Sequence, residues 1–259
     1  MLKHILKHKG IGEEDVSAVK PLALSNRTAW GVVAVAILLW IAAIFLWMQV
    51  GLDRWVLISH TDLRTGGLLD DMGHLATRYG MSIMVLAYLI YLPFAFKFAS
   101  LRDAYRIYLL LILMFAIAGL AGDILKEIVD RPRPFVEYAA RTYALPFPDS
   151  PSFPSGHATK SVALALPFLL FITAKDGWHR AVKVLLATVA LGVCYSRALL
   201  GAHYLSDVLA GVAMALTCVP LVTLLTNKLL QRMDNRMLSR AVFVWAALLA
   251  GLMVLVARI

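Results

Sequence analysis

Two residues in the C-terminal half of the chain have the types and the spacing of a nucleophile and its orienting group. His203 and Asp207 are four positions apart, so on a helix both side chains would lie on one face. A carboxylate placed there can hold one ring nitrogen and leave the other free to attack an electrophile. His157, which ends the sequence Pro-Ser-Gly-His, supplies a second imidazole able to protonate a leaving oxygen.

Three basic residues accompany these histidines at the ends of apolar stretches, namely Lys126, Arg133 and Arg197. So many potential cations would repel one another unless an anion lay among them. A phosphoryl group fits, because arginine forks and lysine point charges both suit its oxygens. The Ser155 hydroxyl and the Gly156 N–H, in a turn that opens a predicted helix, would add two further donors. A plain serine N-cap is the alternative interpretation of that turn.

The sequence contains no carboxylate cluster suited to magnesium. Its two cysteines, Cys194 and Cys218, lie inside apolar stretches and show no Cys/His spacing typical of zinc sites. We therefore expect a site that uses neither a metal ion nor a cofactor.

The composition indicates which elements must position these residues. Hydrophobic residues make up 61% of the 259 positions, charged residues only 16%, and the mean hydropathy is +0.76. This excludes an ordinary soluble domain and indicates an all-α, polytopic membrane bundle. The net charge of +9 could suggest a nucleic-acid partner. In a membrane chain, however, basic residues mark cytoplasmic loops and lipid contacts, so we expect no nucleic-acid partner.

The apolar stretches predict six spans and a seventh, shorter C-terminal one, at residues 30–50, 80–96, 107–125, 157–174, 181–200, 205–226 and 241–257. The seventh stretch could instead form a half-buried hairpin. Residues 52–79 are too polar to span, and Leu68, Met72 and Leu75 recur at helical spacing, which predicts a helix lying in the interface.

These spans divide the chain into a cytoplasmic N-terminal tail at 1–27, a six-span core at 28–226, and a basic loop with the seventh span at 227–259. With the N-terminus inside, most of the 25 lysines and arginines lie on the inside. By the positive-inside rule, the loop before His157 then faces outward.

The polar segments together resemble the three motifs of the type 2 phosphatidic acid phosphatase family. Those motifs are Lys-x6-Arg-Pro, Pro-Ser-Gly-His and Ser-Arg-x5-His-x3-Asp, and they match here from Lys126 to Pro134, from Pro154 to His157 and from Ser196 to Asp207. The resemblance implies a six-helix core and a phosphohistidine intermediate on His203, activated by Asp207, with His157 as the acid. It also implies a phosphate cradle made of Lys126, Arg133, Ser155, Gly156 and Arg197.

The family further implies an integral membrane phosphatase that hydrolyses a lipid phosphate monoester or diphosphate at the outer face. Candidate substrates are phosphatidic acid, phosphatidylglycerophosphate, undecaprenyl diphosphate and a lipid A phosphate. The compact size and short loops favour a bacterial inner membrane. The alternative is a lipid-binding or lipid-transporting membrane protein with a catalytically silent phosphate pocket. The related vanadium haloperoxidases share such a pocket but are not built around membrane spans.

Three further charged residues lie near the motifs. Lys160 lies three positions after His157, so it would either bind a second phosphate or a headgroup, or extend to the membrane surface. Asp123 is one helical turn before Lys126 and is expected to pair with it. Arg131, inside the first motif, is expected to contact lipid headgroups.

Overall fold

A computed structural model of the protein describes residues 21–63, 67–97, 105–138, 150–173, 176–233 and 242–256. Within these residues all regular structure is helical, as predicted. The helices are α2 (Asn26–Met48), α3 (Val50–Thr61), α4 (Leu68–Lys97), α5 (Tyr105–Val129), α6 (Pro134–Glu137), α7 (Gly156–Phe171), α8 (Gly177–Leu199), α9 (Leu205–Leu230) and α11 (Val242–Val256). Most of the N-terminal tail and the basic loop at 234–241 fall outside the described residues.

Five stretches of helix in the described part are long and apolar enough to cross a membrane, namely Asn26–Met48, Leu68–Leu92, Arg106–Glu137, Gly177–Leu199 and Leu205–Leu230. Two further apolar helices, Gly156–Phe171 and Val244–Leu255, are shorter. The fourth and seventh predicted spans are therefore present as helices, but each is shorter than a typical crossing of about 20 residues.

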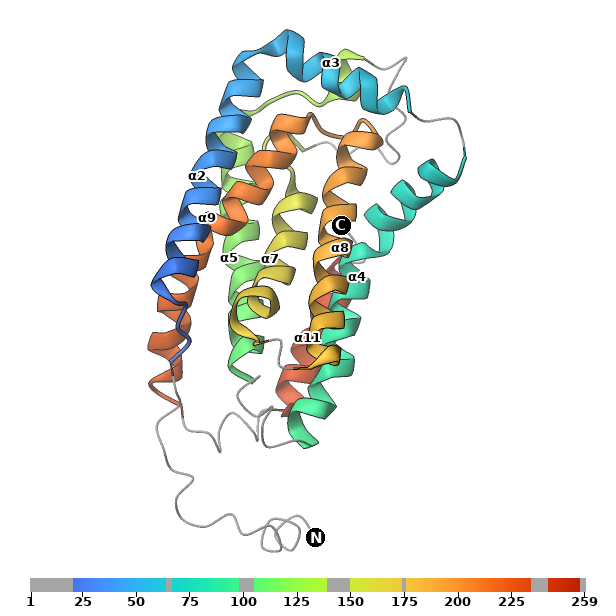
Figure 1. Ribbon diagram of the computed structural model, residues 1–259. Helices are drawn as coiled ribbons and strands as arrows, with labels where there is room; N and C mark the ends of the chain where they lie inside the picture. Colours follow the sequence, from blue (N-terminus) through green and yellow to red (C-terminus); the bar gives the residue numbers. More distant parts are fainter. Residues whose placement is uncertain are drawn as a thin grey trace, which may run out of the picture.

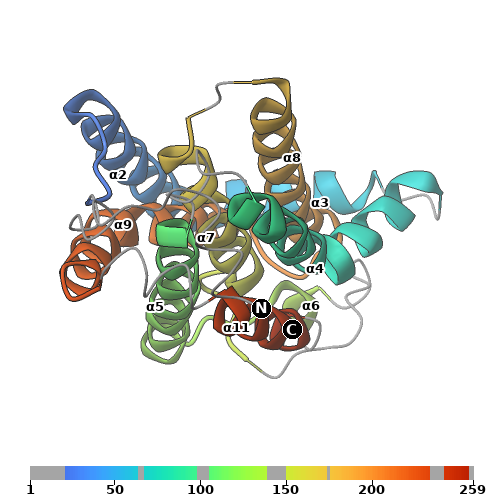
Figure 2. The ribbon, with the colours of Figure 1, turned by 90° about the horizontal axis from the view of Figure 1, so that it is seen from below.

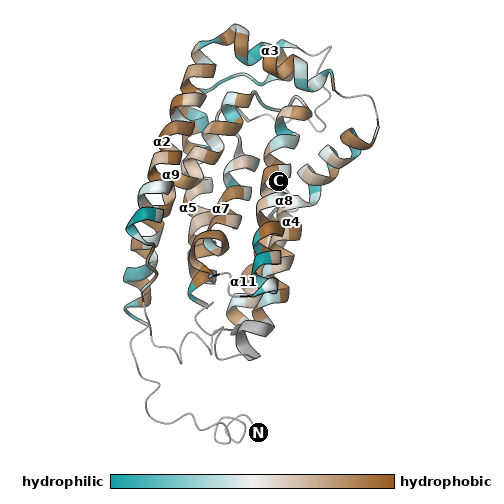
Figure 3. Ribbon diagram, in the orientation of Figure 1, coloured by the Kyte–Doolittle hydropathy of each residue, from teal (hydrophilic) through white to brown (hydrophobic). Residues whose placement is uncertain are grey.

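The long helices surround α7, which contacts α4, α5, α8 and α9 (Figure 2). On the outside of this arrangement, α2 packs along α9 and α11 packs against α4. Hydrophobic residues dominate the ribbon through the middle of the bundle (Figure 3). The central position of α7 explains its length and burial, since a helix enclosed by protein need not match the thickness of the lipid.

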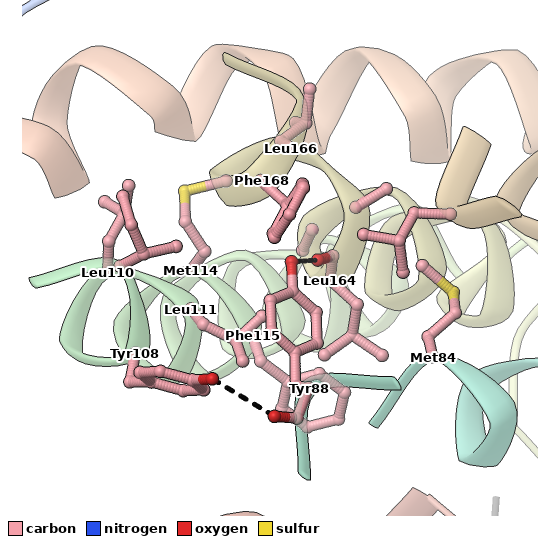
Figure 4. Close-up of a cluster of buried hydrophobic side chains, with 14 of the residues drawn as sticks. Met84, Tyr88, Tyr108, Leu110, Leu111, Met114, Phe115, Leu164, Leu166 and Phe168 are labelled. Atoms are coloured by element: carbon pink, nitrogen blue, oxygen red, sulfur yellow. Dashed lines mark hydrogen bonds between the residues drawn. The ribbon is translucent and has the colours of Figure 1, made fainter. Parts of the chain in front are cut away.

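Two buried tyrosines satisfy their hydroxyl groups inside the apolar core (Figure 4). Tyr88 donates to the carbonyl of Leu164 over 2.7 Å, and Tyr108 donates to the carbonyl of Tyr88 over 3.1 Å. Phe168 packs edge-on against the ring of Tyr88. Because an unpaired hydroxyl in such surroundings costs free energy, these bonds fix α4, α5 and α7 at one mutual register.

The segment at 52–79 differs from its prediction. It forms two helices, α3 and the first turns of α4, and α4 continues without a break through the second predicted span to Lys97. Figure 1 shows α3 crossing one end of the bundle and the start of α4 leaning away from it. The polar residues of these first turns do not interrupt the helix, because helix formation needs hydrogen bonds and propensity, not an apolar sequence.

The ends of four helices meet at the end of the bundle that α3 crosses, the upper end in Figure 1. There α5 and α8 end, and α7 and α9 begin. We call this the site end, because the segments joining these helices carry the three polar motifs.

One glycine allows α9 to approach the start of α7 closely. A Cβ atom added at Gly211 would lie 2.6 Å from the carbonyl oxygen of Ser155 and 3.0 Å from the Cβ of Ala158. The obstruction is backbone, which cannot rotate away as a flexible side chain can. The Pro-Ser-Gly-His turn can therefore lie this close to α9 only because residue 211 is a glycine.

We expect Gly211→Ala to push the start of α7 away from α9 and to destabilise the protein by about 1–3 kcal/mol, the usual cost of overpacking. The measurement is the midpoint of thermal unfolding in detergent. Gly192→Ala in α8 is the matched control, because its added Cβ would meet only the Cβ of Ala76 at 4.0 Å. Equal midpoints for the two variants would contradict the packing described here.

Candidate active site

The structure brings the three polar motifs together at the site end. Lys126 lies in the last turn of α5, and Arg197 in the last turn of α8. Ser155 is the N-cap of α7, so Gly156 and His157 stand in its first turn. His203 precedes α9 by two positions. Residues far apart in the sequence thus converge, as predicted.

Asp207 is completely buried and accepts four hydrogen bonds through its side chain and backbone. Its Oδ2 accepts from the Ser152 hydroxyl over 2.5 Å and from the Tyr204 N–H over 2.9 Å. Its Oδ1 accepts from Nη1 of Arg131 over 2.7 Å. Its backbone carbonyl accepts from the Ser155 N–H over 2.9 Å. These bonds provide the partners that a buried carboxylate requires.

The pairing of His203 with Asp207 arises differently from the prediction. His203 is not on α9, whose N-cap is Tyr204, so the two residues do not share a helical face. Asp207 folds back over the start of its helix to reach the Tyr204 N–H, as in a capping box. This brings its Oδ2 to 3.5 Å from Nδ1 of His203.

A serine hydroxyl bridges that gap. Oγ of Ser152 lies 3.3 Å from Nδ1 of His203 and 2.5 Å from Oδ2 of Asp207. A hydroxyl can accept from Nδ1–H while donating to the carboxylate. The sequence did not indicate this contact of Ser152, because no spacing rule connects a serine in a loop with a histidine 51 positions later.

Arg133 faces the other ring nitrogen. Its Nη1 lies 3.1 Å from Nε2 of His203 and 3.2 Å from the carbonyl oxygen of Ala202, while its Nε donates to the carbonyl of Ser150 over 2.7 Å. Arginine has donors only, so Nε2 must be the acceptor and the imidazole proton must be on Nδ1. The hydrogen-bond network therefore leaves a lone pair on Nε2, facing a cation.

The other two predicted cations, Lys126 and Arg197, lie within electrostatic reach of His203. Nζ of Lys126 donates to the carbonyl of Pro151 over 2.7 Å, and a Cβ added at Gly156 would lie 3.7 Å from the Lys126 side chain. Nη1 of Arg197 donates to the Thr77 hydroxyl over 3.1 Å. The Nε of Arg197 is buried and has no partner among the described residues. A buried N–H of this kind is the group that a bound oxyanion would satisfy.

His157 stands within electrostatic reach of Arg197, His203 and Lys160. It lies in the first turn of α7, where the backbone N–H groups have no carbonyl acceptor within the helix. The arrangement thus places one imidazole at a helix terminus, where unpaired N–H groups favour an anion, and a second imidazole beside Arg133.

Two charged residues have partners other than those predicted. Arg131 does not extend to lipid headgroups: it is largely buried and forms ion pairs with Asp207 at 2.7 Å and with Asp53 at 3.0 Å. Asp123 lies 3.6 Å from Nζ of Lys160, so its ion pair is with Lys160 and not with Lys126. The site end therefore contains a second buried carboxylate, Asp53 of α3, which the sequence did not indicate.

Comparison with known proteins places this arrangement in a family. The model of the PAP2 superfamily matches residues 107–231, which include all three motifs. An undecaprenyl-diphosphatase of Sulfolobus acidocaldarius is 30% identical over 147 residues, covering 55% of this chain and 68% of that relative. The chain belongs to the PAP2 superfamily. The resemblance to the type 2 phosphatidic acid phosphatases is thereby confirmed.

Other PAP2 relatives come from Bacillus subtilis. An undecaprenyl-diphosphatase is 32% identical over 109 residues, and phosphatidylglycerophosphatase B is 31% identical over 113 residues. The matches cover 40% and 42% of this chain, and 52% of each relative, so they span about half the length of these proteins.

The fold has a solved counterpart. The crystal structure of a transmembrane PAP2 type phosphatidylglycerolphosphate phosphatase from Bacillus subtilis superposes with a TM-score of 0.54 at 22% identity. The superposition covers 77% of this chain and 96% of the other. The shared fold agrees with a multi-pass membrane protein.

Burial and the charges of Arg133 and Arg197 hold the pKa of His203 well below its usual value of 6.5. The unfolded chain therefore binds a proton at pH values where the folded protein does not, so stability is complete above about pH 6.5 and falls below it. We expect the unfolding midpoint of His203→Asn to fall less than that of the wild type between about pH 7 and about pH 5, since each unprotonated group costs up to about 1.4 kcal/mol per pH unit.

The measurement is thermal unfolding at a fixed scan rate across this pH range. His74→Asn, which changes an exposed histidine of α4, should follow the wild type. Parallel curves for wild type and His203→Asn would show that His203 does not titrate as the site geometry requires.

Proposed function

We propose that the protein is a membrane lipid phosphatase that transfers a phosphoryl group from a lipid to His203 and then to water. The observation that carries the proposal is the environment of His203. Asp207 and Ser152 stand behind its Nδ1, while its Nε2 lone pair faces Arg133. A nucleophile, its orienting carboxylate and a cradle for phosphate oxygens are then in one place.

In the first step Nε2 attacks phosphorus, the bond from phosphorus to the leaving oxygen breaks, and His157 gives its proton to that oxygen. Lys126, Arg133 and Arg197 balance the charge on the phosphoryl oxygens, with the Ser155 hydroxyl and the Gly156 N–H as further donors. In the second step water attacks the phosphohistidine, His157 accepts a proton from the water, and orthophosphate leaves. No step needs a metal ion.

A lipid substrate suits the position of the site at the end of an apolar bundle. The exposed faces of α2 and α9 carry large apolar side chains such as Ile41 and Leu221, so an acyl or prenyl tail could remain in lipid while the phosphate reaches Lys126. The relatives named above include undecaprenyl-diphosphatases and a phosphatidylglycerophosphatase. We propose that the substrate is undecaprenyl diphosphate, phosphatidylglycerophosphate, phosphatidic acid or a lipid A phosphate.

We further propose that the site end faces outward from a bacterial inner membrane. With the N-terminus inside, the sequence segments assigned to the opposite end hold 15 of the 25 lysines and arginines, and several of the other ten, such as Lys126, Arg133 and Arg197, belong to the proposed site. The positive-inside rule assigns that end to the cytoplasm. A silent lipid-binding protein, the alternative function, would have no use for a histidine backed by a buried carboxylate.

The purified protein should release orthophosphate from one or more of these lipids in detergent with EDTA present, and orthovanadate should inhibit the release. His203→Ala should lower kcat at least about a thousandfold, because the covalent route is lost while binding groups remain. His74→Ala, at an exposed histidine, is the control. Unchanged turnover in His203→Ala would rule out the phosphohistidine, and loss of turnover with EDTA would rule out metal-free chemistry.

Lys160 provides a test of preference between monoesters and diphosphates. It lies one turn beyond His157, and its partner Asp123 is half exposed, so a second phosphate could replace that carboxylate. We expect Lys160→Met to lower kcat/KM about tenfold for a lipid diphosphate, the value of one charge-assisted bond, with little change for a monoester. Asp123→Asn is the matched control, since it frees Lys160. Equal losses of kcat/KM on both substrates would mean that Lys160 has only a structural role, in its ion pair with Asp123.

A further inference from the structure

Asp53 is a buried carboxylate that lies far from every motif in the sequence. It lies on α3, which crosses the site end of the bundle (Figure 1). Asp53, Leu57 and Thr61 form one buried face of this helix, whereas Trp55 on another face is 64% exposed. The side chain of Asp53 is only 1% exposed. A charge so removed from water is costly unless its partners are strong ones.

Among the described residues, the side chain of Asp53 has its hydrogen-bond partners in the active-site segments. Its Oδ2 accepts from the Ser206 hydroxyl over 2.5 Å and from Nη2 of Arg131 over 3.0 Å. Its Oδ1 accepts from the Ser206 N–H over 3.2 Å, in the first turn of α9. Asp53 thus holds both the guanidinium that contacts Asp207 and the helix terminus that carries Asp207.

Arg131 connects the two carboxylates. Its Nη1 donates to Oδ1 of Asp207 over 2.7 Å and to the Ser206 hydroxyl over 2.6 Å, while Nη2 donates to Asp53. The ring of Tyr204 covers the guanidinium at 3.9 Å. Because one edge of the fork is held by Asp53, only one remains for Asp207.

This division has two consequences for Asp207. Its Oδ2 remains turned towards Ser152, and hence towards Nδ1 of His203. In addition, one positive guanidinium is shared between two negative carboxylates. Arg131 therefore neutralises Asp207 only in part, and the carboxylate of Asp207 can stabilise the cationic imidazole that forms when Nε2 bonds to phosphorus.

We propose that Asp53 is a positioning residue of the phosphatase reaction, acting through Arg131 to keep Asp207 turned towards Ser152 and His203. The inference rests on the proposed function. Without the Asp53 carboxylate, Arg131 would turn both edges of its fork to Asp207, the geometry that arginine and carboxylate prefer, and draw it away from Ser152. The phosphate cradle itself, made of Lys126 and Arg197 among others, would remain.

The test is steady-state kinetics of the full-length protein in detergent, on whichever of the four candidate lipids it hydrolyses fastest. Asp53→Asn keeps the shape of the side chain and removes its charge. It should lower kcat about 10- to 100-fold, the range that small misplacement of a reacting group costs. KM and the inhibition constant of orthovanadate should each change less than about threefold, because the cradle is intact. Asp53→Glu should recover part of the lost kcat.

Two comparisons separate positioning from a general structural effect. Asp71→Asn, which removes an exposed carboxylate of α4, should leave kcat unchanged. In an Arg131→Gln background, Asp53→Asn should cost little more, because the connection to Asp207 is already broken. Additive losses in the double variant would overturn the proposal.

The remaining outcomes each decide a different point. If the wild type is active and Asp53→Asn has the same kcat, the proposed role of Asp53 is overturned and the proposed function is not. Weakened vanadate inhibition together with a lowered unfolding midpoint assigns Asp53 to stability alone and equally overturns it. A wild type inactive on every lipid phosphate overturns the proposed function, and this inference with it.

Discussion

One buried residue, Asp207, fastens the three polar segments of the site to one another. Its carboxylate holds Arg131 of the first segment and Ser152 just before the second, and its backbone carbonyl holds Ser155. It also caps the helix on which it lies, through the Tyr204 N–H. Removing one partner from such a buried charge typically costs about 3–5 kcal/mol. The same interactions that satisfy Asp207 therefore also give the site its shape.

The membrane imposes a second condition on that shape. A polar cluster cannot lie in the hydrocarbon without partners, so it must lie where the apolar helices end. At 16 residues, α7 is about 24 Å long at the usual rise of an α-helix, less than the roughly 30 Å of a hydrocarbon core. A helix this short cannot reach both boundaries. Its terminus can be recessed without exposing backbone to lipid, because other helices enclose it. That makes α7 suitable for presenting N–H groups to a phosphate at the membrane boundary.

The sequence predicted what depends on composition and residue type. Apolar stretches located the helices, and the residue types of the motifs indicated an anion site whose members do converge. The prediction failed where contacts between distant segments decide the result. Asp53 and Ser152 carry no spacing signal, since each meets Asp207 or its partners only after α3 and the loop before α7 have packed against α9. Arg131 was assigned to headgroups for the same reason, because its partner is 78 positions away.

The segment at 52–79 illustrates a different limit. Hydropathy separates its polar half from the second span, whereas the backbone forms one helix across that boundary. Helical hydrogen bonding depends on local residues, and whether a helix is apolar determines only what surrounds it. Hydropathy therefore indicates where lipid contacts begin, not where a helix starts.

The short segment from Arg131 to Pro134 supplies a cation on each side of His203. Proline fixes its own φ and favours an extended conformation for the residue before it. Arg131 precedes Pro132 and Arg133 precedes Pro134, so both arginines are restricted in this way. Arg133 has the extended values of φ −80° and ψ 154°. Arg131 and Arg133 are separated by Pro132, and Arg131 reaches Asp207 while Arg133 reaches Nε2 of His203. The histidine is consequently held between two cations of fixed spacing, one acting through Asp207 behind Nδ1 and the other in front of Nε2. A negative phosphate arriving at Nε2 can replace the ring nitrogen as the acceptor of Arg133, which frees the lone pair at the moment when the substrate is bound.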